Sequence, residues 1–128
     1  MTLLLDSYTV IWFLTGDDRC SLRARAAIED EAGDVLVSAA SAWEIATKVR
    51  LGRWPEAAAI AVNMREALAR NDFANLDVTM EHGLLAGSFP VSHGDPFDRM
   101  LAAQAQIEKV TLVTADPAFQ AFDIQTLW

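Results

Sequence analysis

Apolar and polar residues follow two alternating patterns along this chain. Short runs of consecutive apolar residues predict buried strands, whereas apolar residues spaced three and four positions apart predict helices. Because the two patterns take turns along the sequence, they favour an α/β domain with a mostly parallel sheet. The predicted strands span residues 2–5, 35–37, 73–78, 111–114 and 124–127, and the pattern is weaker at 73–78.

Glycine and proline mark the ends of the predicted helices. Glycine is common immediately after a helix, and proline is common in its first turn. The predicted helices span residues 7–14, 22–32, 41–51, 55–70, 79–87 and 97–108. Gly16, Gly33 and Gly52 end the first three, while Pro55 and Pro96 begin two others. No repeat, low-complexity tract or linker interrupts the pattern, so residues 1–128 are expected to form one domain.

The composition narrows the setting in which the protein works. Hydrophobic residues make up 52% of the 128 residues, which is typical of a globular chain. No apolar run approaches the roughly 20 residues of a membrane helix, and the start of the chain lacks the basic segment of a signal peptide. Cys20 is the only cysteine, which excludes an intrachain disulfide and a cysteine-based metal site. A cytoplasmic location is the simplest expectation.

The net charge bears on the kind of partner. The formal charge is −8, because 18 acidic residues outnumber 10 lysines and arginines. A protein that binds nucleic acid through a broad electrostatic face is normally basic. Either this chain does not bind nucleic acid, or part of its negative charge is concentrated in a site that metal ions neutralise.

Acidic residues follow the predicted strands at their carboxyl ends. Asp6 ends the first strand, Glu44 lies six residues after Ser38 at the end of the second, and Asp116 follows the strand at 111–114. In an open parallel sheet, ligands bind beyond the carboxyl ends of the strands, so distant acids meet at one edge. Asp95 and Asp98 begin a helix whose N-terminus can reach the same edge.

Carboxylates gathered in this way indicate metal chemistry. Two ionised carboxylates about 4 Å apart at an effective dielectric constant of about 20 repel each other by about 4 kcal/mol. Protons or a divalent cation relieve that repulsion, and a set of oxygen ligands suits Mg²⁺ or Mn²⁺. Two such ions about 4 Å apart can clamp the in-line displacement at a phosphodiester. The chain offers Asp6, Glu44, Asp98 and Asp116 for this role, with Asp95 as a fifth acid.

Each of these acids also has a purely structural interpretation. Asp6 can cap the helix after the first strand, and Asp95 can cap the helix that follows Pro96. Glu44 stands three residues after Ser41, as in a capping box, and Asp116 precedes a proline, as in an ordinary turn. Taken singly, none of the acids indicates chemistry, and their shared position at strand ends is the argument for a site.

Other polar and aromatic residues have two interpretations each. Thr114 can hydrogen-bond an acid or a metal-bound water. Lys48, Arg50 and Arg53 cluster at the end of the helix carrying Glu44, where they either complement the helix dipole or contact a phosphate. Arg99 can pair with a carboxylate or a phosphate. His82 is expected on a helix surface and His93 in a loop, neither as a metal ligand. The aromatic residues are expected in the core or an interface rather than as base-stacking platforms: Trp12, Phe13, Trp43, Trp54, Phe97 and Phe119.

Four segments occur in this order along the chain: Leu3-Leu4-Leu5-Asp6-Ser7, the Ser38–Lys48 segment with Trp43-Glu44, Asp95-Pro96-Phe97-Asp98-Arg99-Met100-Leu101, and Thr114-Ala115-Asp116-Pro117. Together they resemble PIN domains, and more narrowly the VapC toxins of bacterial type II toxin–antitoxin modules. The third segment is the most specific of the four. The resemblance implies a PIN-like fold, a central parallel sheet of about four or five strands flanked by helices.

The resemblance also implies a function. It implies an endoribonuclease that uses Mg²⁺ or Mn²⁺ to activate a water, an antitoxin of the VapB type as partner, and a homodimer. The family's four core acids fall on Asp6, Glu44, Asp98 and Asp116, with Asp95 as a further acid and Thr114 as the hydroxyl beside the last one. Relatives often carry Asp-Thr-His after the first strand, where this chain has Asp6-Ser7-Tyr8. Ser7 keeps the hydroxyl, and Tyr8 replaces the imidazole.

Two other function classes remain open at this point. One is a different metal-dependent phosphoryl hydrolase, although Tyr8 stands where a haloacid-dehalogenase-type phosphatase needs a second aspartate. The other is a non-catalytic PIN-like interaction module. Stabilisation by Mn²⁺ separates these classes, because a pure scaffold should show little of it.

Overall fold

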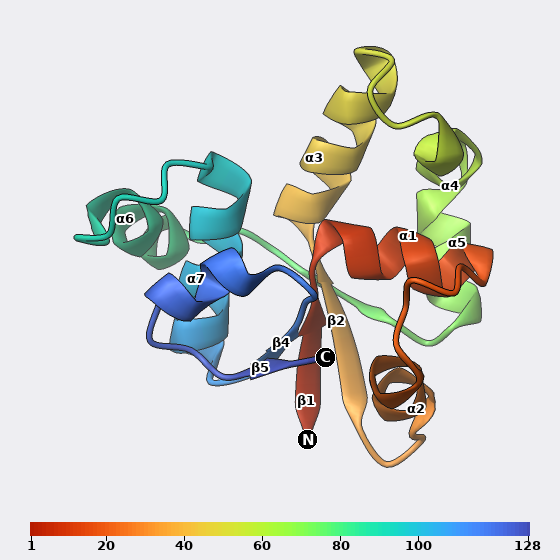
Figure 1. Cartoon of the computed structure of the whole chain (residues 1–128), viewed down its shortest axis with the longest axis horizontal. Coiled ribbons are helices and arrows are strands. Elements are labelled where there is room, and N and C mark those ends of the chain that lie inside the picture. The colour runs from red at the N-terminus through yellow and green to blue at the C-terminus, as the bar shows by residue number, and fades with distance from the viewer.

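The computed structural model describes residues 1–128 and is built around one five-stranded sheet (Figure 1). The strands are β1 (Thr2–Leu5), β2 (Asp34–Ser38), β3 (Ala74–Leu76), β4 (Thr111–Val113) and β5 (Thr126–Leu127). Their order across the sheet is β3-β2-β1-β4-β5, and all four pairings are parallel. The predicted α/β class and the predicted parallel sheet are therefore confirmed.

Seven α-helices and two short 3₁₀ helices connect the strands. They are α1 (Ser7–Thr15), α2 (Leu22–Glu29), α3 (Ala39–Arg50), η1 (Pro55–Ala57), α4 (Ala58–Val62), α5 (Met64–Arg70), α6 (Met80–Ser88), α7 (Pro96–Glu108) and η2 (Pro117–Ala121). The single helix predicted over 55–70 was wrong, because Asn63 leaves the helical region (φ −120°, ψ 28°) and separates α4 from α5. Asparagine competes with helical hydrogen bonds through its own side chain, and the alanines around it do not compensate. None of these helices has the length and apolar character needed to cross a membrane.

The sheet carries a separate core on each face. Leu3 and Leu5 pack in one cluster with Val10 of α1 and Ile28 of α2, whereas Leu4 between them packs in another with residues of α7 and β4. Successive side chains of a strand point to opposite faces, so a strand covered on both sides reads as a continuous apolar run. Figure 1 shows α1 and α2 on one side of β1 and α7 on the other. This burial fixes the central strand and thus the position of the residue that follows it.

His82 is a second correction to the sequence-based picture. We expected it on a helix surface, but only 1% of it is exposed. Its Nδ1 accepts a hydrogen bond from the backbone N–H of Thr79 and its Nε2 lies 2.9 Å from Oε2 of Glu108. The imidazole thus closes the N-terminus of α6 in the place that Glu or Gln usually takes, and it ties α6 to α7.

The aromatic residues divide into buried, half-buried and exposed members. Trp54 and Phe119 are buried, as expected of core residues. Trp12, Phe13 and Phe97 are half-buried. Trp43 is 64% exposed and meets only the ring of Phe97 edge-on, with 4.8 Å between centroids. A place in the core was therefore wrong for Trp43.

Candidate active site

Asp6 stands at the carboxyl end of the central strand. Its Oδ1 accepts a hydrogen bond of 2.8 Å from the backbone N–H of Thr9 and so caps α1, while its Oδ2 accepts one of 2.5 Å from the hydroxyl of Thr114. Its backbone N–H donates to the carbonyl of Val113 on β4. Asp6 therefore caps α1, as one interpretation expected, and the same buried carboxylate also lies where a site residue was expected.

Glu44 lies on α3, the helix that directly follows β2. Ser38, the last residue of β2, is itself the cap of α3, because its hydroxyl accepts from the backbone N–H of Ala40. The helix therefore begins two residues before the predicted start, and the capping box with Ser41 was wrong. Glu44 lies inside the helix, 4% exposed, and its Oε1 accepts a hydrogen bond of 2.6 Å from the hydroxyl of Ser7.

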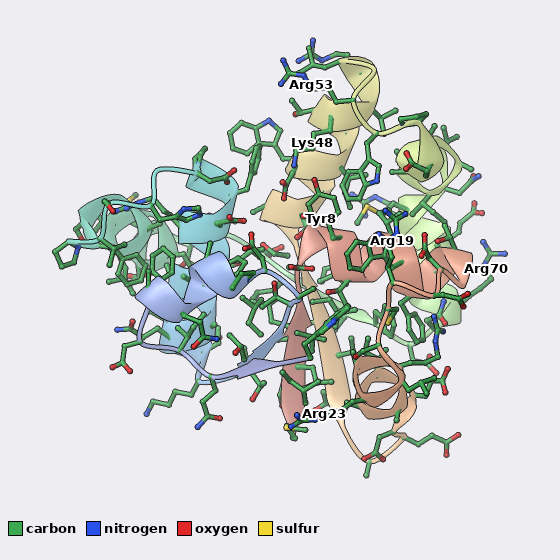
Figure 2. The ribbon with its side chains drawn as sticks, viewed as in Figure 1. Tyr8, Arg19, Arg23, Lys48, Arg53 and Arg70 are labelled. Carbon is green, nitrogen blue, oxygen red and sulfur yellow. The ribbon has the colours of Figure 1, made fainter.

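Lys48 lies one helical turn after Glu44 on the same side of α3. Its ammonium is 2.7 Å from Oε2 of Glu44 and 3.4 Å from the hydroxyl of Tyr8. Figure 2 shows Lys48 on α3 and Tyr8 on α1. Burial alone would lower the pKa of Lys48, but the hydrogen bond and the negative charge of Glu44 outweigh it and raise that pKa. Lys48 is therefore charged at neutral pH and fixed beside the acid. Arg50 and Arg53 lie exposed at the end of this helix.

The start of α7 supplies two further carboxylates. Asp95 is the cap: its Oδ1 accepts hydrogen bonds from the backbone N–H groups of Phe97 (2.9 Å) and Asp98 (3.0 Å), and Pro96 occupies the first turn. Asp98 projects from that first turn, and its Oδ2 lies 2.8 Å from Nε2 of His93. The expectation that Asp95 caps this helix is confirmed.

Asp116 reaches the same edge from the turn after β4. Its Oδ1 caps η2 by accepting a hydrogen bond of 2.9 Å from the backbone N–H of Ala118. Its own backbone N–H donates to the hydroxyl of Thr114 over 3.0 Å. Unlike Asp6 and Glu44, this carboxylate is exposed to solvent.

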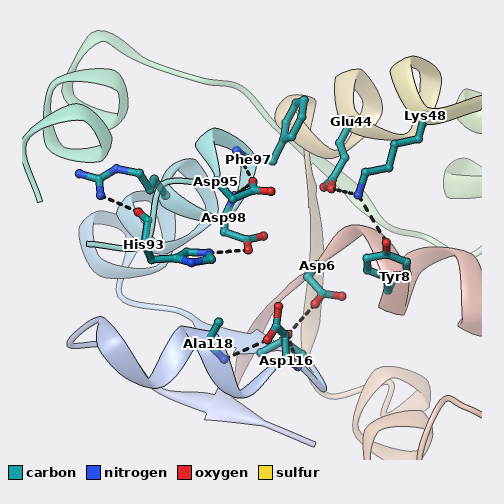
Figure 3. Close-up of polar contacts among 12 residues, drawn as sticks. Asp6, Tyr8, Glu44, Lys48, His93, Asp95, Phe97, Asp98, Asp116 and Ala118 are labelled. Atoms are coloured by element: carbon teal, nitrogen blue, oxygen red, sulfur yellow. Dashed lines mark hydrogen bonds and ion pairs between the residues drawn. The ribbon is translucent and has the colours of Figure 1, made fainter. Parts of the chain in front are cut away.

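The five carboxylates line one hollow of about 280 Å³ at the carboxyl edge of the sheet (Figure 3). The other lining residues are Ser7, Tyr8, Lys48, His93, Leu101 and Phe119. A larger hollow of about 570 Å³ lies against a different side of α3, between it and α4 and α5, and its lining is mainly apolar. The concentration of acids therefore identifies the smaller hollow, called the acid pocket below, as the candidate site.

Two of the five carboxyl groups in the acid pocket, those of Asp6 and Asp98, have raised pKa values. Burial raises the pKa of Asp6 above its usual range, and the charge of Glu44 adds to this, while hydrogen bonds from Thr114 and Thr9 oppose it. Burial also raises the pKa of Asp98 to about 6, with the charges of Asp95 and Glu44 adding and the bond to His93 opposing. A bound cation would favour the ionised form of both carboxyl groups, against burial and the neighbouring negative charges.

The donor set of the acid pocket fits a hard divalent cation. Carboxylate oxygens suit Mg²⁺ or Mn²⁺, and no cysteine is near to favour a softer metal. No three Asp, Glu, His or Cys side chains are arranged as the ligands of a single ion here. The fit is therefore to an ion that keeps several of its waters, as Mg²⁺ usually does.

Arg99 is engaged elsewhere. Its guanidinium donates hydrogen bonds of 2.8 to 3.0 Å to four backbone carbonyls in the last turn of α6 and the loop before α7, and the nearest carboxylates receive none of them. The carbonyls belong to Ala86, Phe89, Val91 and His93. A planar fork of donors is well suited to several carbonyls at once. An ion pair with a neighbouring acid, one of our two expectations for Arg99, was wrong.

Two polar residues of the acid pocket, Tyr8 and His93, were not predicted from the sequence to be site residues. Tyr8 was noticed only as a departure from relatives, and His93 only as a loop residue. His93 does lie in a loop, but its ring reaches Asp98 because the Arg99 contacts fold that loop against α7. No local signal marks such a residue, since the contact depends on the conformation of an irregular segment.

Fold and pocket together define a class, the small parallel α/β domains that gather carboxylates at the carboxyl ends of their strands. The chain belongs to the PIN domain family, whose sequence model matches residues 3–125, and PIN domains are nucleases. The resemblance seen in the sequence motifs is thus confirmed. No curated protein matches the chain in sequence.

Solved structures of three complexes share the fold over nearly the whole chain. VapBC2 from Rickettsia felis, bound to a DNA fragment from its promoter, is 14% identical with a TM-score of 0.71, and the match covers 100% of this chain and 99% of that one. VapBC-1 from nontypeable Haemophilus influenzae is 17% identical with a TM-score of 0.63, and the match covers 99% of this chain and 97% of that one. FitAcB from Neisseria gonorrhoeae is 18% identical with a TM-score of 0.63, and the match covers 98% of this chain and 96% of that one. At such identities the similarity establishes the fold alone.

Proposed function

We propose that the protein is a metal-dependent endoribonuclease and the toxin of a VapBC-like toxin–antitoxin module. One observation carries the proposal: in a PIN domain, carboxylates from four separate segments of the chain line one pocket. Nuclease chemistry by bound cations needs such a set and no nucleophilic side chain. RNA as the substrate and the toxin role rest on the motif resemblance and on the fold shared with VapBC and FitAcB structures.

The four core acids Asp6, Glu44, Asp98 and Asp116 would hold Mg²⁺ or Mn²⁺ directly or through water, with Asp95 beside them. The bound ions supply an activated water for attack on the phosphodiester and charge stabilisation for the leaving oxygen.

Polar residues in or beside the acid pocket orient two of these acids. Thr114 holds Oδ2 of Asp6, while Ser7 and Lys48 take one oxygen of Glu44 each. Loss of a hydrogen bond that orients a metal-holding residue commonly lowers metal affinity 10- to 100-fold.

Basic side chains at the C-terminal end of α3 would contact the phosphates of the RNA backbone. Lys48 is the only lysine or arginine that lines the acid pocket, and it would contact the phosphate at or next to the cleaved bond. Arg50 and Arg53 lie exposed beyond it and would contact phosphates farther along the RNA strand. Figure 2 shows Arg53 at the end of α3. Arg99 is removed from this role, because its donors are already satisfied by backbone carbonyls.

The partner in the module would be an antitoxin of the VapB type. Basic side chains on its docking segment could reach the acid pocket and offset part of the net charge of −8. Expression of the chain alone is expected to arrest bacterial growth, and co-expression of the adjacent antitoxin gene to restore it. Like its relatives the chain is expected to form a homodimer, which sedimentation tests directly.

Cleavage of total bacterial RNA tests the enzymatic part. The purified protein is incubated with Mg²⁺, Mn²⁺ or EDTA beside the Asp98→Asn variant, and the new RNA ends are sequenced. Discrete cuts that require both metal and Asp98 are expected, and they also name the target. A folded, antitoxin-free sample that makes no cuts and gains no thermal stability from Mn²⁺ would contradict the proposal and favour a non-catalytic module.

A further inference from the structure

Among the phenylalanines, tyrosines and tryptophans, Tyr8 is the one that both lines the acid pocket and is exposed to solvent. It follows Asp6 and Ser7 directly at the start of α1, and it is 43% exposed although Asp6, Ser7 and Thr9 are all buried. Its ring lines the acid pocket together with the carboxylates. Phe119, the other aromatic residue of the lining, is only 2% exposed and belongs to the core.

A buried tryptophan supports the inner face of this ring. Trp54 is 5% exposed, packs in a cluster with Ile11 and Ile45, and lies with its ring centroid 4.5 Å from that of Tyr8. Gly52, at φ +72°, turns the chain at the end of α3 and so brings Trp54 back to this position. Tyr8 therefore packs against Trp54, while the residue stays partly exposed and lines the acid pocket.

Lys48 connects the ring to the acids. Its ammonium lies 5.0 Å from the centroid of Tyr8, 3.4 Å from the tyrosine hydroxyl and 2.7 Å from Glu44 (Figure 3). A partly exposed aromatic residue, a fixed cation and a carboxylate thus follow one another within one pocket. A nucleotide presents the complementary groups, a base for the ring and a phosphate for the cation.

We infer that Tyr8 is a substrate-positioning residue that stacks on an unpaired base of single-stranded RNA, on the nucleotide adjoining the cleaved bond. The inference rests on the proposed function and adds to it a nucleotide subsite with a stated preference for unpaired substrate. Stacking of this kind tolerates any base but requires that the base be free of a duplex.

Trp43 offers a matched control. It is more exposed than Tyr8 and also carried by an element of the site, yet it does not line the acid pocket and its ring packs against Phe97. Trp43→Leu therefore removes an exposed aromatic ring without altering the proposed subsite. Tyr8→Phe is the second control, since it keeps the ring and loses only the hydroxyl.

The test uses a fluorescent single-stranded RNA that spans the cleavage site mapped in total RNA. Its affinity is measured by anisotropy with Mn²⁺ in an Asp116→Asn background, which is not expected to cut. Tyr8→Leu is expected to weaken binding about 10- to 100-fold, the loss found when a stacking aromatic is removed, and to raise KM by a similar factor in the active protein. Tyr8→Phe and Trp43→Leu are expected to stay within about threefold of their parent. Thermal unfolding confirms that each variant is folded.

A second probe identifies stacking as the cause. An RNA that lacks the base next to the cleaved bond, but keeps its ribose and phosphate, should bind the parent more weakly and Tyr8→Leu no more weakly than the intact RNA does. Equal losses with both proteins would overturn the inference, as would unchanged RNA affinity in Tyr8→Leu. If Tyr8→Leu instead weakens only the antitoxin complex, the ring serves the protein partner and the inference also fails. A wild-type protein that neither binds nor cuts RNA refutes the proposed function as well.

Discussion

The hydroxyl of Thr114 links Asp6 and Asp116, two carboxylate residues that lie far apart in the sequence. It donates a hydrogen bond of 2.5 Å to Oδ2 of Asp6, 108 residues away, and accepts one of 3.0 Å from the backbone N–H of Asp116. Because Thr114 is only 5% exposed, water does not compete for either contact. One hydroxyl therefore joins the carboxylate at the end of β1 to the turn after β4.

Replacing this hydroxyl is expected to weaken metal binding. Thr114→Val keeps the shape but removes the hydrogen bond that opposes the raised pKa of Asp6, so that Asp6 ionises less readily. The apparent affinity for Mn²⁺, measured by calorimetry near pH 7, should fall about 10- to 100-fold. Thr114→Ser keeps the donor and should bind within about threefold of wild type. Equal affinities for the valine and serine variants would show that the bond does not control the acid.

Asp6 allows catalysis and folding to be separated by two substitutions. Asp6→Asn keeps an oxygen that can accept from Thr9, so α1 stays capped while the charge needed for a cation is lost. Cleavage should disappear, and Tm in EDTA should stay within about 3 °C of wild type. Asp6→Ala also loses the cap, which costs about 1 kcal/mol, and should lower Tm by roughly 4 °C relative to the asparagine variant. Full cleavage by Asp6→Asn would exclude Asp6 as a metal ligand.

The raised pKa of Asp98 predicts a pH-dependent stability in the absence of metal. The folded-state pKa, about 6, lies above the usual value of 3.8, so the folded protein binds this proton more tightly than the unfolded chain does. The free energy of unfolding contributed by this group therefore falls as the pH rises from about 4 to about 6. In EDTA, Asp98→Asn should raise Tm by a few degrees near pH 7.5 and by much less near pH 4.5.

Addition of Mn²⁺ should reverse the order of the two proteins near pH 7.5. The wild type gains stability because a cation offsets its carboxylates, whereas Asp98→Asn gains little. A wild type that remains the less stable of the two in saturating Mn²⁺ would mean that Asp98 does not contribute to cation binding.

Arg99 is expected to act on the loop before α7 and not on RNA. Arg99→Lys leaves a point charge in place of a planar fork, and most of its four short bonds to carbonyls are lost. Tm should fall by several degrees, and amide exchange should increase in residues 87–95. The salt dependence of RNA binding should be unchanged, because no phosphate contact is removed. A reduced slope of affinity against salt would return Arg99 to the substrate-binding residues.

Local pattern predicted the elements well where burial alone determines them. The run at Leu3-Leu4-Leu5 predicts a strand covered on both faces, and that strand is β1 at the centre of the sheet. The break at Asn63 was not predicted, because the alanine-rich pattern on either side continues through it. Strand order was not predicted either, since it depends on which faces the helices cover.

The acids at strand ends were predictable because the carboxyl edge of a parallel sheet gathers them whatever the strand order. The residues that hold those acids were less so. The burial of His82 between α6 and α7 and the contact of His93 with Asp98 depend on helix packing and on an irregular loop. No sequence pattern predicts that Tyr8 lines the acid pocket. Its position depends on the turn at Gly52, which brings Trp54 against its ring.

Three of the five carboxylates cap helices, and the other two do not. Asp6, Asp95 and Asp116 begin α1, α7 and η2, whereas Glu44 and Asp98 begin nothing. Homologues that had lost nuclease activity would still be under selection to fold. Its descendants should retain Asp, Asn or Ser at positions 6, 95 and 116, while positions 44 and 98 drift freely. Loss of the acid at position 44 or 98 would therefore be the first sequence change expected in a homologue that no longer cleaves its substrate.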